Sequence, residues 1–200
     1  DLEAGLNERC PSVSRYSPLS DLVLTTSALL QGNFPNQAGA WKMNKQRMVE
    51  QWSTLERGLN CMAEFLNNEG IYDAQRLPTN AVLAVIAALY AHIPDAGDKR
   101  GRDEVLLKKY LWHAFFTDRY ENSAPTNAFA DFNALKRIIA DQTKEDDTPY
   151  TTTDVPIFAD HSLVEIEEIL TADWPKRNTI RGRGVLAVLC SLNALDFATG

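Results

Sequence analysis

The chain has 200 residues, of which 44% are hydrophobic and 24% are charged, and its net charge at neutral pH is −7. These proportions are ordinary for a globular domain with one core, and the lack of a run of about 18 apolar residues argues against a membrane span. The acidic balance argues against a protein that coats nucleic acid through general positive charge, and it leaves a local basic patch open.

The hydrophobic spacing is helical from the first third of the chain. Ser17 followed by Pro18 is typical of a helix start, and Gly32 is typical of a helix end. Residues 44–68 carry apolar side chains at alternating spacings of four and three, which predicts one long core-facing helix that stops at Gly70. The members of this stripe are Met48, Trp52, Leu55, Leu59, Met62 and Leu66.

The middle of the chain predicts a buried helix. Residues 81–93 are almost uniformly apolar, with Thr79 or Asn80 as a polar cap and Pro94 as the stop. A helix that is apolar on all sides belongs at the centre of a core. The polar residues 95–104 predict a connection between this helix and the next one.

Four further segments complete the predicted fold. Leu107, Leu111 and Phe115 mark one helix, and Thr126 or Asn127 caps the next, which carries Phe129, Phe132, Leu135 and Ile139. Residues 141–161 predict a long loop. A capping box at 162–165 opens a helix through Leu170, and a last apolar helix begins near Gly184. We therefore expect an all-α fold, an irregular bundle of about seven helices.

No catalytic or metal-binding pattern is visible among the candidate residues. His92, His113 and His161 are far apart and lack a partner at ligand spacing. Glu165 and Glu168 share a helix face with Glu167 beside them, but acidic residues in a first turn are accounted for by the helix dipole. We predict no metal and no cofactor.

The cysteines bear on the cellular compartment of the protein. Cys10, Cys61 and Cys190 are odd in number and widely spaced, which fits neither a disulfide framework nor a zinc site. Apolar helical surroundings raise the pKa of a thiol, so we read Cys61 and Cys190 as unreactive. Reduced thiols predict a cytoplasmic protein.

A basic cluster stands out against the acidic chain. Lys176, Arg177, Arg181 and Arg183 place four positive charges within eight residues. A contact with a nucleic-acid phosphate backbone is one interpretation, and a basic loop that pairs with the preceding acidic helix is the other. The RGRG motif at 181–184 also invites an anion site at a helix N-terminus, although it lacks phosphate-loop spacing and a preceding strand.

A polar turn between two apolar runs carries a second cluster. In the stretch FFTDRYENSAPTNAFADF, Arg119 and Asp131 fit a structural ion pair across the turn, with Tyr120 packing beneath it. We interpret these three residues as a clamp between two helices, and not as chemistry.

Three segments together carry a family resemblance. In chain order, these segments are RLPTNAVLAVIAALY, LWHAFFTDRYENSAPTNAFADFNALKRII and RGRGVLAVLCSLNALDFATG. They resemble segments that occur in the same order in the GmrSD-type modification-dependent restriction endonucleases. Such proteins join a ParB/sulfiredoxin-like nucleotide-hydrolysing domain to a helical region and a C-terminal HNH nuclease. The acidic DGQQR-like motif of the first domain and the HxxP-type motif of the nuclease are absent here.

The chain does not begin with Met, and the resemblance implies that residues 1–200 are one helical domain, a piece of a longer phage-defence protein. We expect a non-catalytic segment that joins the nucleotide-hydrolysing and nuclease domains of its parent and contacts DNA. The alternative is a helical protein-interaction scaffold that binds no nucleic acid, a function that the net charge of −7 favours.

Overall fold

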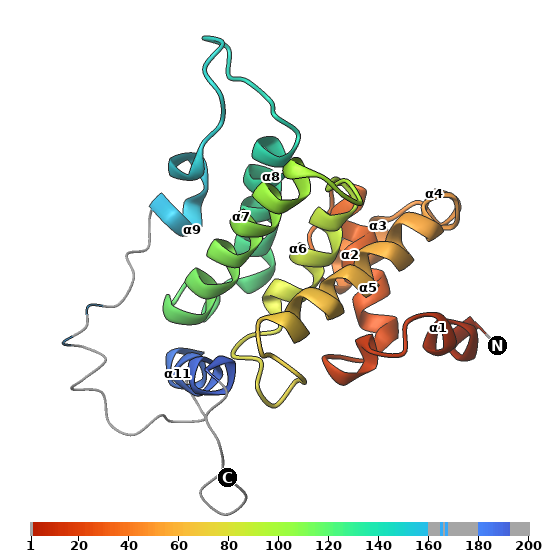
Figure 1. Cartoon of the computed structure of the whole chain (residues 1–200). Coiled ribbons are helices and arrows are strands. Elements are labelled where there is room, and N and C mark those ends of the chain that lie inside the picture. Colours follow the sequence, from red (N-terminus) through yellow and green to blue (C-terminus); the bar gives the residue numbers. More distant parts are fainter. Residues whose placement is uncertain (1, 160–164, 166, 168–179, 193–200) are drawn as a thin grey trace, which may run out of the picture.

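The computed structural model describes residues 2–159, 165, 167 and 180–192, and this part of the chain is all α-helical with no strand (Figure 1). The predicted fold class is confirmed. The described residues form ten α-helices where about seven were expected, because short helices near the N-terminus and within the expected loop were missed and one expected helix is divided. The missed helices are α1 (Leu2–Arg9), α3 (Gln37–Lys42) and α9 (Pro156–Ala159), the last of which lies within the expected loop 141–161, and the expected helix 44–68 is divided into α4 (Lys45–Glu50) and α5 (Trp52–Asn68).

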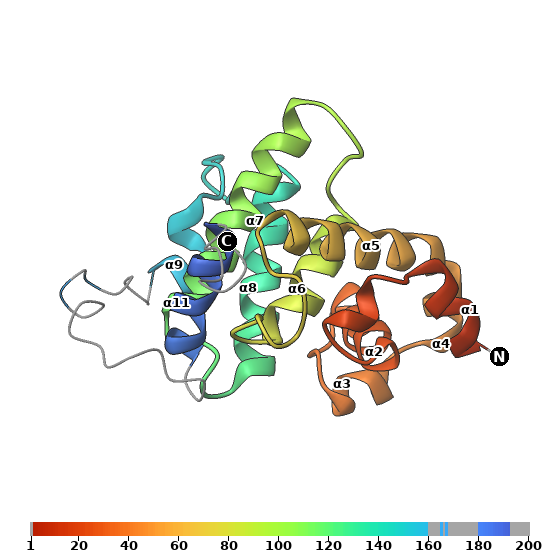
Figure 2. The ribbon, with the colours of Figure 1, turned by 60° about the horizontal axis from the view of Figure 1, so that its bottom comes forward.

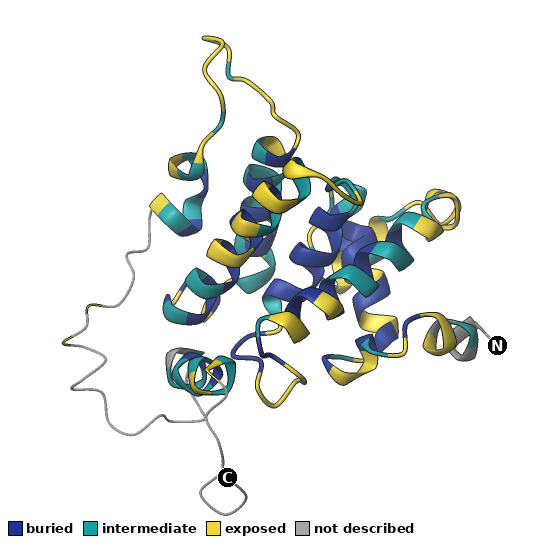
Figure 3. Cartoon of the chain, viewed as in Figure 1, coloured by how far each residue is buried: buried dark blue, intermediate teal, exposed yellow. Residues whose placement is uncertain are grey.

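Helix α6 (Ala81–Tyr90) is the centre of the bundle. It packs against α2 (Leu19–Leu30), α5 (Trp52–Asn68) and α8 (Ala124–Ile139), and every residue from Val82 to Tyr90 is buried (Figure 3). This confirms the prediction from its uniformly apolar sequence. At Gly58 of α5 the two backbones come so close that a Cβ would lie 2.3 Å from the Ala87 carbonyl oxygen.

The expected long helix from 44 to 68 is interrupted. The chain forms α4, turns at Gln51 (φ −91°, ψ 11°) and resumes as α5. The core-facing stripe is confirmed for Leu55, Leu59, Met62 and Leu66, which are buried, whereas none of the six residues of α4 is buried. Met48 and Trp52, the first two members of the stripe, are partly buried and pack against the core.

Helices α7 (Asp98–Phe116) and α8 both contribute buried side chains to the core, and the turn at residues 117–123 joins them. The expected polar connection 95–104 is wrong beyond residue 97, because Asp98 already begins α7. Its first turns are supported by Lys99–Asp103 (3.4 Å) and Arg100–Glu104 (2.9 Å) ion pairs four residues apart.

The start of α8 also differs from the prediction. The helix begins at Ala124 after Ser123, whose φ of 53° lies in the left-handed region, and it holds a proline in its first turn. Asn127 therefore does not cap the helix. Its side-chain amide donates to the carbonyl oxygens of Arg119 (2.7 Å) and Asn122 (3.1 Å) and closes the turn.

The predicted loop from 141 onward extends from the bundle, as Figure 1 shows. An antiparallel bridge joins Thr143 and Pro149, and a 3₁₀ turn at Thr152–Asp154 leads into α9, which packs against α7 and α8. The capping box at 162–165 and the helix through Leu170 lie outside the described residues, apart from Glu165 and Glu167.

Helix α11 (Ile180–Ser191) packs against α7 (Figures 1 and 2) and is seen nearly end-on in Figure 1. Gly184 allows the close approach, since a Cβ there would lie 2.6 Å from the Phe115 carbonyl oxygen. The expected start near Gly184 is wrong by about one turn, because the helix already includes residue 180. None of the helices in the described ranges is long and apolar enough to cross a lipid bilayer.

Candidate functional site

The structure brings the three residues of the clamp together. Arg119 donates from Nε and Nη2 to the two oxygens of Asp131, at 3.1 and 3.0 Å. The Asp131 side chain is fully buried, and only 9% of the Arg119 side chain is exposed. The hydroxyl of Tyr120 donates to the same carboxylate at 2.8 Å, and the Ile157 N–H donates at 3.3 Å.

Tyr120 does more than pack beneath the ion pair. Its hydroxyl lies 2.7 Å from the Tyr110 hydroxyl, and since its proton is directed at Asp131, Tyr110 must donate to Tyr120. Burial, with the negative charge of Asp131 adding to it, raises the pKa of both phenols well above their usual value. The chain of hydroxyls is therefore neutral and proton-holding at physiological pH, and it ties α7, the turn, α8 and α9 into one unit.

Two of the three histidines lie in the described residues, His92 just after α6 and His113 within α7. Burial lowers the pKa of His92 and of His113, which favours neutral rings. His113 Nδ1 lies 2.9 Å from the Lys109 carbonyl oxygen within α7, and His161 lies outside the described residues. Within the described ranges, no group of three or more His, Cys, Asp or Glu side chains could hold a metal ion.

The three cysteines are free thiols. Cys10 is buried, whereas Cys61 and Cys190 are half-buried. Burial raises the pKa of the Cys10 and Cys61 thiols, so neither is an activated nucleophile.

Only part of the predicted basic cluster falls within the described chain. Lys176, Arg177 and the side chain of Arg181 lie outside it, and Arg183 lies within α11. Because α11 begins at residue 180, the RGRG motif runs through the helix and does not form a glycine loop in front of it. The expectation that these glycines form a loop is therefore wrong, whereas an anion at this helix start stays a prediction.

Arg183 lies against the segment that connects α5 to α6. Its Nη2 donates to the carbonyl oxygens of Ala74 (2.9 Å) and Gln75 (3.3 Å). The N–H of Ala74 donates to the carbonyl oxygen of Arg15 at 2.9 Å. The backbone of Ala74 thus contacts both arginines, the backbone of Arg15 through its N–H and the side chain of Arg183 through its carbonyl oxygen. Two arginines from distant parts of the sequence therefore line one site.

This site is an open groove of about 690 Å³, which we call the arginine groove. It is lined by residues 14–18, 74, 77–80 and 183. Tyr16 fixes one wall through a hydrogen bond from its hydroxyl to the Ile71 carbonyl oxygen (2.7 Å), and burial raises its pKa to about 12.

The charges of the arginine groove are positive. Arg15 is exposed and Arg183 is half-buried, and no carboxylate in the described part of the chain forms an ion pair with either. The nearby carboxylate of Asp73 is engaged by Arg76. Guanidinium groups without a carboxylate partner are suited to bind phosphate or carboxylate oxygens.

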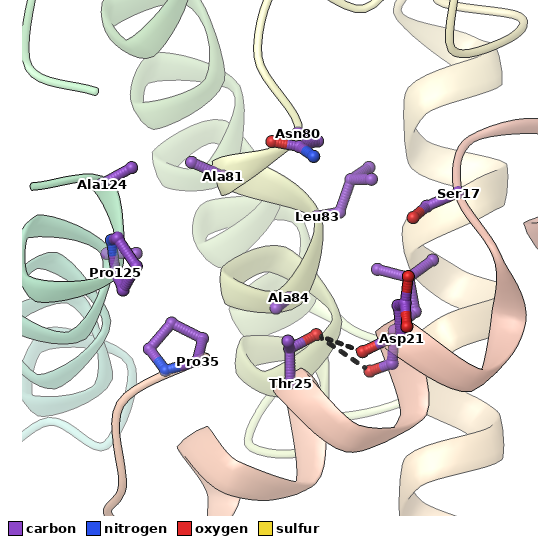
Figure 4. Close-up of a pocket in the computed structure, with 12 residues that line it drawn as sticks. Ser17, Asp21, Thr25, Pro35, Asn80, Ala81, Leu83, Ala84, Ala124 and Pro125 are labelled. Carbon is purple, nitrogen blue, oxygen red and sulfur yellow. Dashed lines mark hydrogen bonds between the residues drawn. The ribbon is translucent and has the colours of Figure 1, made fainter. Parts of the chain in front are cut away.

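A second cavity of about 200 Å³ adjoins the arginine groove and shares Ser17 and Asn80 with it. Figure 4 shows that its walls are small apolar side chains of α6 and the start of α8, such as Ala84 and Pro125, with Pro35 and α2 on the other side. Thr25 on α2 is turned back to the carbonyl oxygens of its own helix. The cavity is smaller than typical ligand pockets, and its lining is mixed, because the polar side chains of Ser17, Asp21 and Asn80 lie among the apolar ones.

Sequence reasoning could not find the arginine groove. Arg183 was a candidate because it belongs to the basic cluster in the sequence. Nothing in the sequence around Arg15 marks it as a candidate, because Arg15 and Arg183 share a site only through the packing of residues 71–79 against the N-terminal turn. These observations define the class of molecule, an all-α domain with a cationic groove and no catalytic constellation in its described part. Comparison with family models, with curated proteins and with solved structures gives no match.

Proposed function

We propose that this chain is a non-catalytic, DNA-contacting helical domain of a modification-dependent restriction endonuclease. The observation that carries the DNA contact is the arginine groove, in which neither Arg15 nor Arg183 forms an ion pair with a carboxylate of the described residues. Phosphate contacts of this kind position a protein on DNA without reading its sequence.

The resemblance of the sequence to GmrSD-type enzymes supports the rest of the proposal. In that setting the domain joins a nucleotide-hydrolysing domain to an HNH nuclease, takes no cofactor of its own and leaves cleavage to the nuclease. The coding sequence around this segment in its parent gene tests the family: an HNH motif downstream supports it, and a parent gene without one contradicts it.

The groove is tested by titrating duplex DNA with the protein at roughly 50 mM and 200 mM salt. We expect Arg15→Gln with Arg183→Gln to weaken binding and to reduce the slope of log affinity against log salt by roughly 2, since each phosphate contact contributes about 0.9. Arg183→Gln also removes hydrogen bonds to two backbone carbonyl oxygens, so the melting temperature of each variant is recorded in parallel.

A matched control removes two cations elsewhere. Arg102 and Lys108 are exposed on α7 and do not line the groove, so Arg102→Gln with Lys108→Gln changes the net charge equally. An equal loss of affinity in both double variants would mean that only overall charge matters, and the groove assignment would be wrong.

The competing function is a protein-interaction scaffold without nucleic-acid contact, which the net charge of −7 favours. Wild-type protein that binds no duplex DNA even at low salt would support the scaffold and refute the DNA-contacting domain. Binding that falls steeply with salt and depends on the two arginines supports the proposed function.

A further inference from the structure

The corner formed by α3 and α4 exposes a tryptophan. Trp41 is 78% exposed, the most exposed large apolar side chain in the described residues. Indole rings carry a large apolar area and are usually buried in part. The corner lies at the end of the molecule away from α9 and α11 (Figures 1 and 2).

Three cations surround this tryptophan in the chain. Lys42, Lys45 and Arg47 are all exposed, and none forms an ion pair within the described ranges. No Asp or Glu occurs between Asp21 and Glu50. A stretch with a net charge of +3 therefore stands in a chain whose net charge is −7.

The corner is held in one conformation by side chains that cap and anchor it. The side-chain amide of Gln31 accepts from the N–H of Asn44 (2.8 Å) and donates to its carbonyl oxygen (3.1 Å), which fixes the link between the two helices to the end of α2. Asn36 accepts from the Gly39 N–H at 2.8 Å, and the Asn44 side chain accepts from the Arg47 N–H at 3.1 Å.

Gly39 adds a close backbone contact. A Cβ at this position would lie 1.9 Å from the Phe34 carbonyl oxygen, so only glycine lets α3 sit against the preceding loop. Trp41 is thus presented on an anchored surface, and it is exposed without being on a loose loop.

We propose that this corner, Trp41 with Lys42, Lys45 and Arg47, binds single-stranded nucleic acid. Trp41 stacks on an unpaired base and the three cations contact the flanking phosphates, the combination by which sequence-tolerant single-strand binders work. A base within a duplex is stacked on both faces, so the exposed indole adds nothing to duplex binding.

The shape of the corner favours nucleic acid over an anionic membrane. Helices that lie in a lipid interface present a wide apolar face along their length. Here α3 and α4 have six residues each, and they are separated by two extended residues, Met43 and Asn44. The only other large apolar side chain that α3 and α4 expose is Val49, which is 61% exposed. So small an apolar area among cations matches a strand of bases and phosphates better than it matches acyl chains.

The inference rests on the proposed function only in that both take nucleic acid, and the two sites share no residue. The test measures fluorescence anisotropy of a labelled oligothymidylate of about 12 nucleotides, within the span of one small binding module, and of a duplex of the same length. The protein variants are Trp41→Ala and the triple variant Lys42→Gln, Lys45→Gln, Arg47→Gln.

Two controls match these variants. Tyr72→Ala removes another exposed aromatic side chain, 40% exposed and remote in sequence from the corner. Arg102→Gln, Lys108→Gln and Lys109→Gln remove three exposed cations from α7. We expect Trp41→Ala to weaken oligothymidylate binding roughly 5- to 100-fold, the value of stacking on one base, and to leave duplex affinity unchanged.

The outcomes separate the two proposals. Single-strand binding that depends on Trp41 sustains this inference even if the arginine groove binds no duplex. Single-strand affinity that is unchanged by Trp41→Ala or by the triple variant overturns it, even if Arg15 and Arg183 bind duplex. Binding to phosphatidylserine vesicles with none to oligothymidylate at low salt also overturns it.

Discussion

The clamp provides a stability prediction whose size follows from burial. Arg119→Ala would leave the Asp131 carboxylate, which has no exposed side-chain surface, without its bidentate cation. Two hydrogen bonds would remain, from the Tyr120 hydroxyl and the Ile157 N–H. Removing one partner of a buried ion pair costs about 3–5 kcal/mol, because the other charge stays buried and uncompensated.

For a domain of this size, such a loss lowers the melting temperature by roughly 6–20 °C, taking about 2–4 °C per kcal/mol. The measurement is urea and thermal unfolding followed by circular dichroism. Arg102→Ala is the matched control, because Arg102 pairs with Asp141 at 3.1 Å while both side chains are more than 60% exposed. An exposed pair of this kind contributes less than about 1 kcal/mol.

A double-mutant cycle isolates the pair itself. Arg119→Ala with Asp131→Ala should destabilise less than the sum of the single variants, with a coupling energy of roughly 1–3 kcal/mol. If Arg119→Ala costs no more than Arg102→Ala, or if the coupling is absent, the assignment of the clamp as a buried structural pair is refuted. Unchanged stability together with lost DNA binding would instead make Arg119 a contact residue.

Three further predictions follow from buried groups and close contacts. The pKa values of the Tyr110 and Tyr120 phenols are raised in the folded protein, so as pH rises the unfolded chain loses these protons first. Their contribution to the free energy of unfolding is therefore fully present below about pH 10 and falls above it. In urea titrations at alkaline pH, Tyr110→Phe should make the free energy of unfolding fall less steeply with pH. Burial lowers the pKa of His92, so the unfolded chain gains a proton first as pH falls below 6.5; His92→Gln should reduce the loss of stability between pH 6.5 and pH 5, roughly, and an unchanged acid profile would contradict this. Gly58→Ala should destabilise by about 1–3 kcal/mol despite the better helix propensity of alanine, because its Cβ would meet the Ala87 carbonyl oxygen, and a gain in thermal stability would show that the close approach is not required.

Much of the fold could be predicted because its strongest signals are local. The uniformly apolar sequence of α6 placed it at the centre, and the spacing of Leu55, Leu59 and Met62 placed α5 on the core. Helix ends were less predictable. Helix α7 starts at Asp98 because ion pairs support its polar first turns. The predicted helix 44–68 is broken at Gln51, although its apolar pattern is continuous there. Both helix ends depend on contacts with neighbouring segments, which local sequence does not reveal.

The sites divide in the same way. Arg119 and Asp131 are 12 residues apart on either side of a visible turn, so their pairing could be inferred. Arg15 and Arg183 meet only through a third segment, around Ala74, which no spacing reveals. The α3–α4 corner did have a signal in the sequence, the acid-free stretch from residue 22 to residue 49, but it becomes informative only once Trp41 is known to be exposed.

The central position of α6 has a consequence for synthesis. Two of its packing partners, α2 and α5, precede it in the chain, but the third, α8, follows it and ends at Ile139. The 49 residues between Tyr90 and Ile139 take roughly 2–10 s to translate at about 5–20 residues per second. For that interval the most apolar of the described helices leaves the ribosome with one side uncovered, which makes it a segment of the nascent chain that a chaperone would recognise.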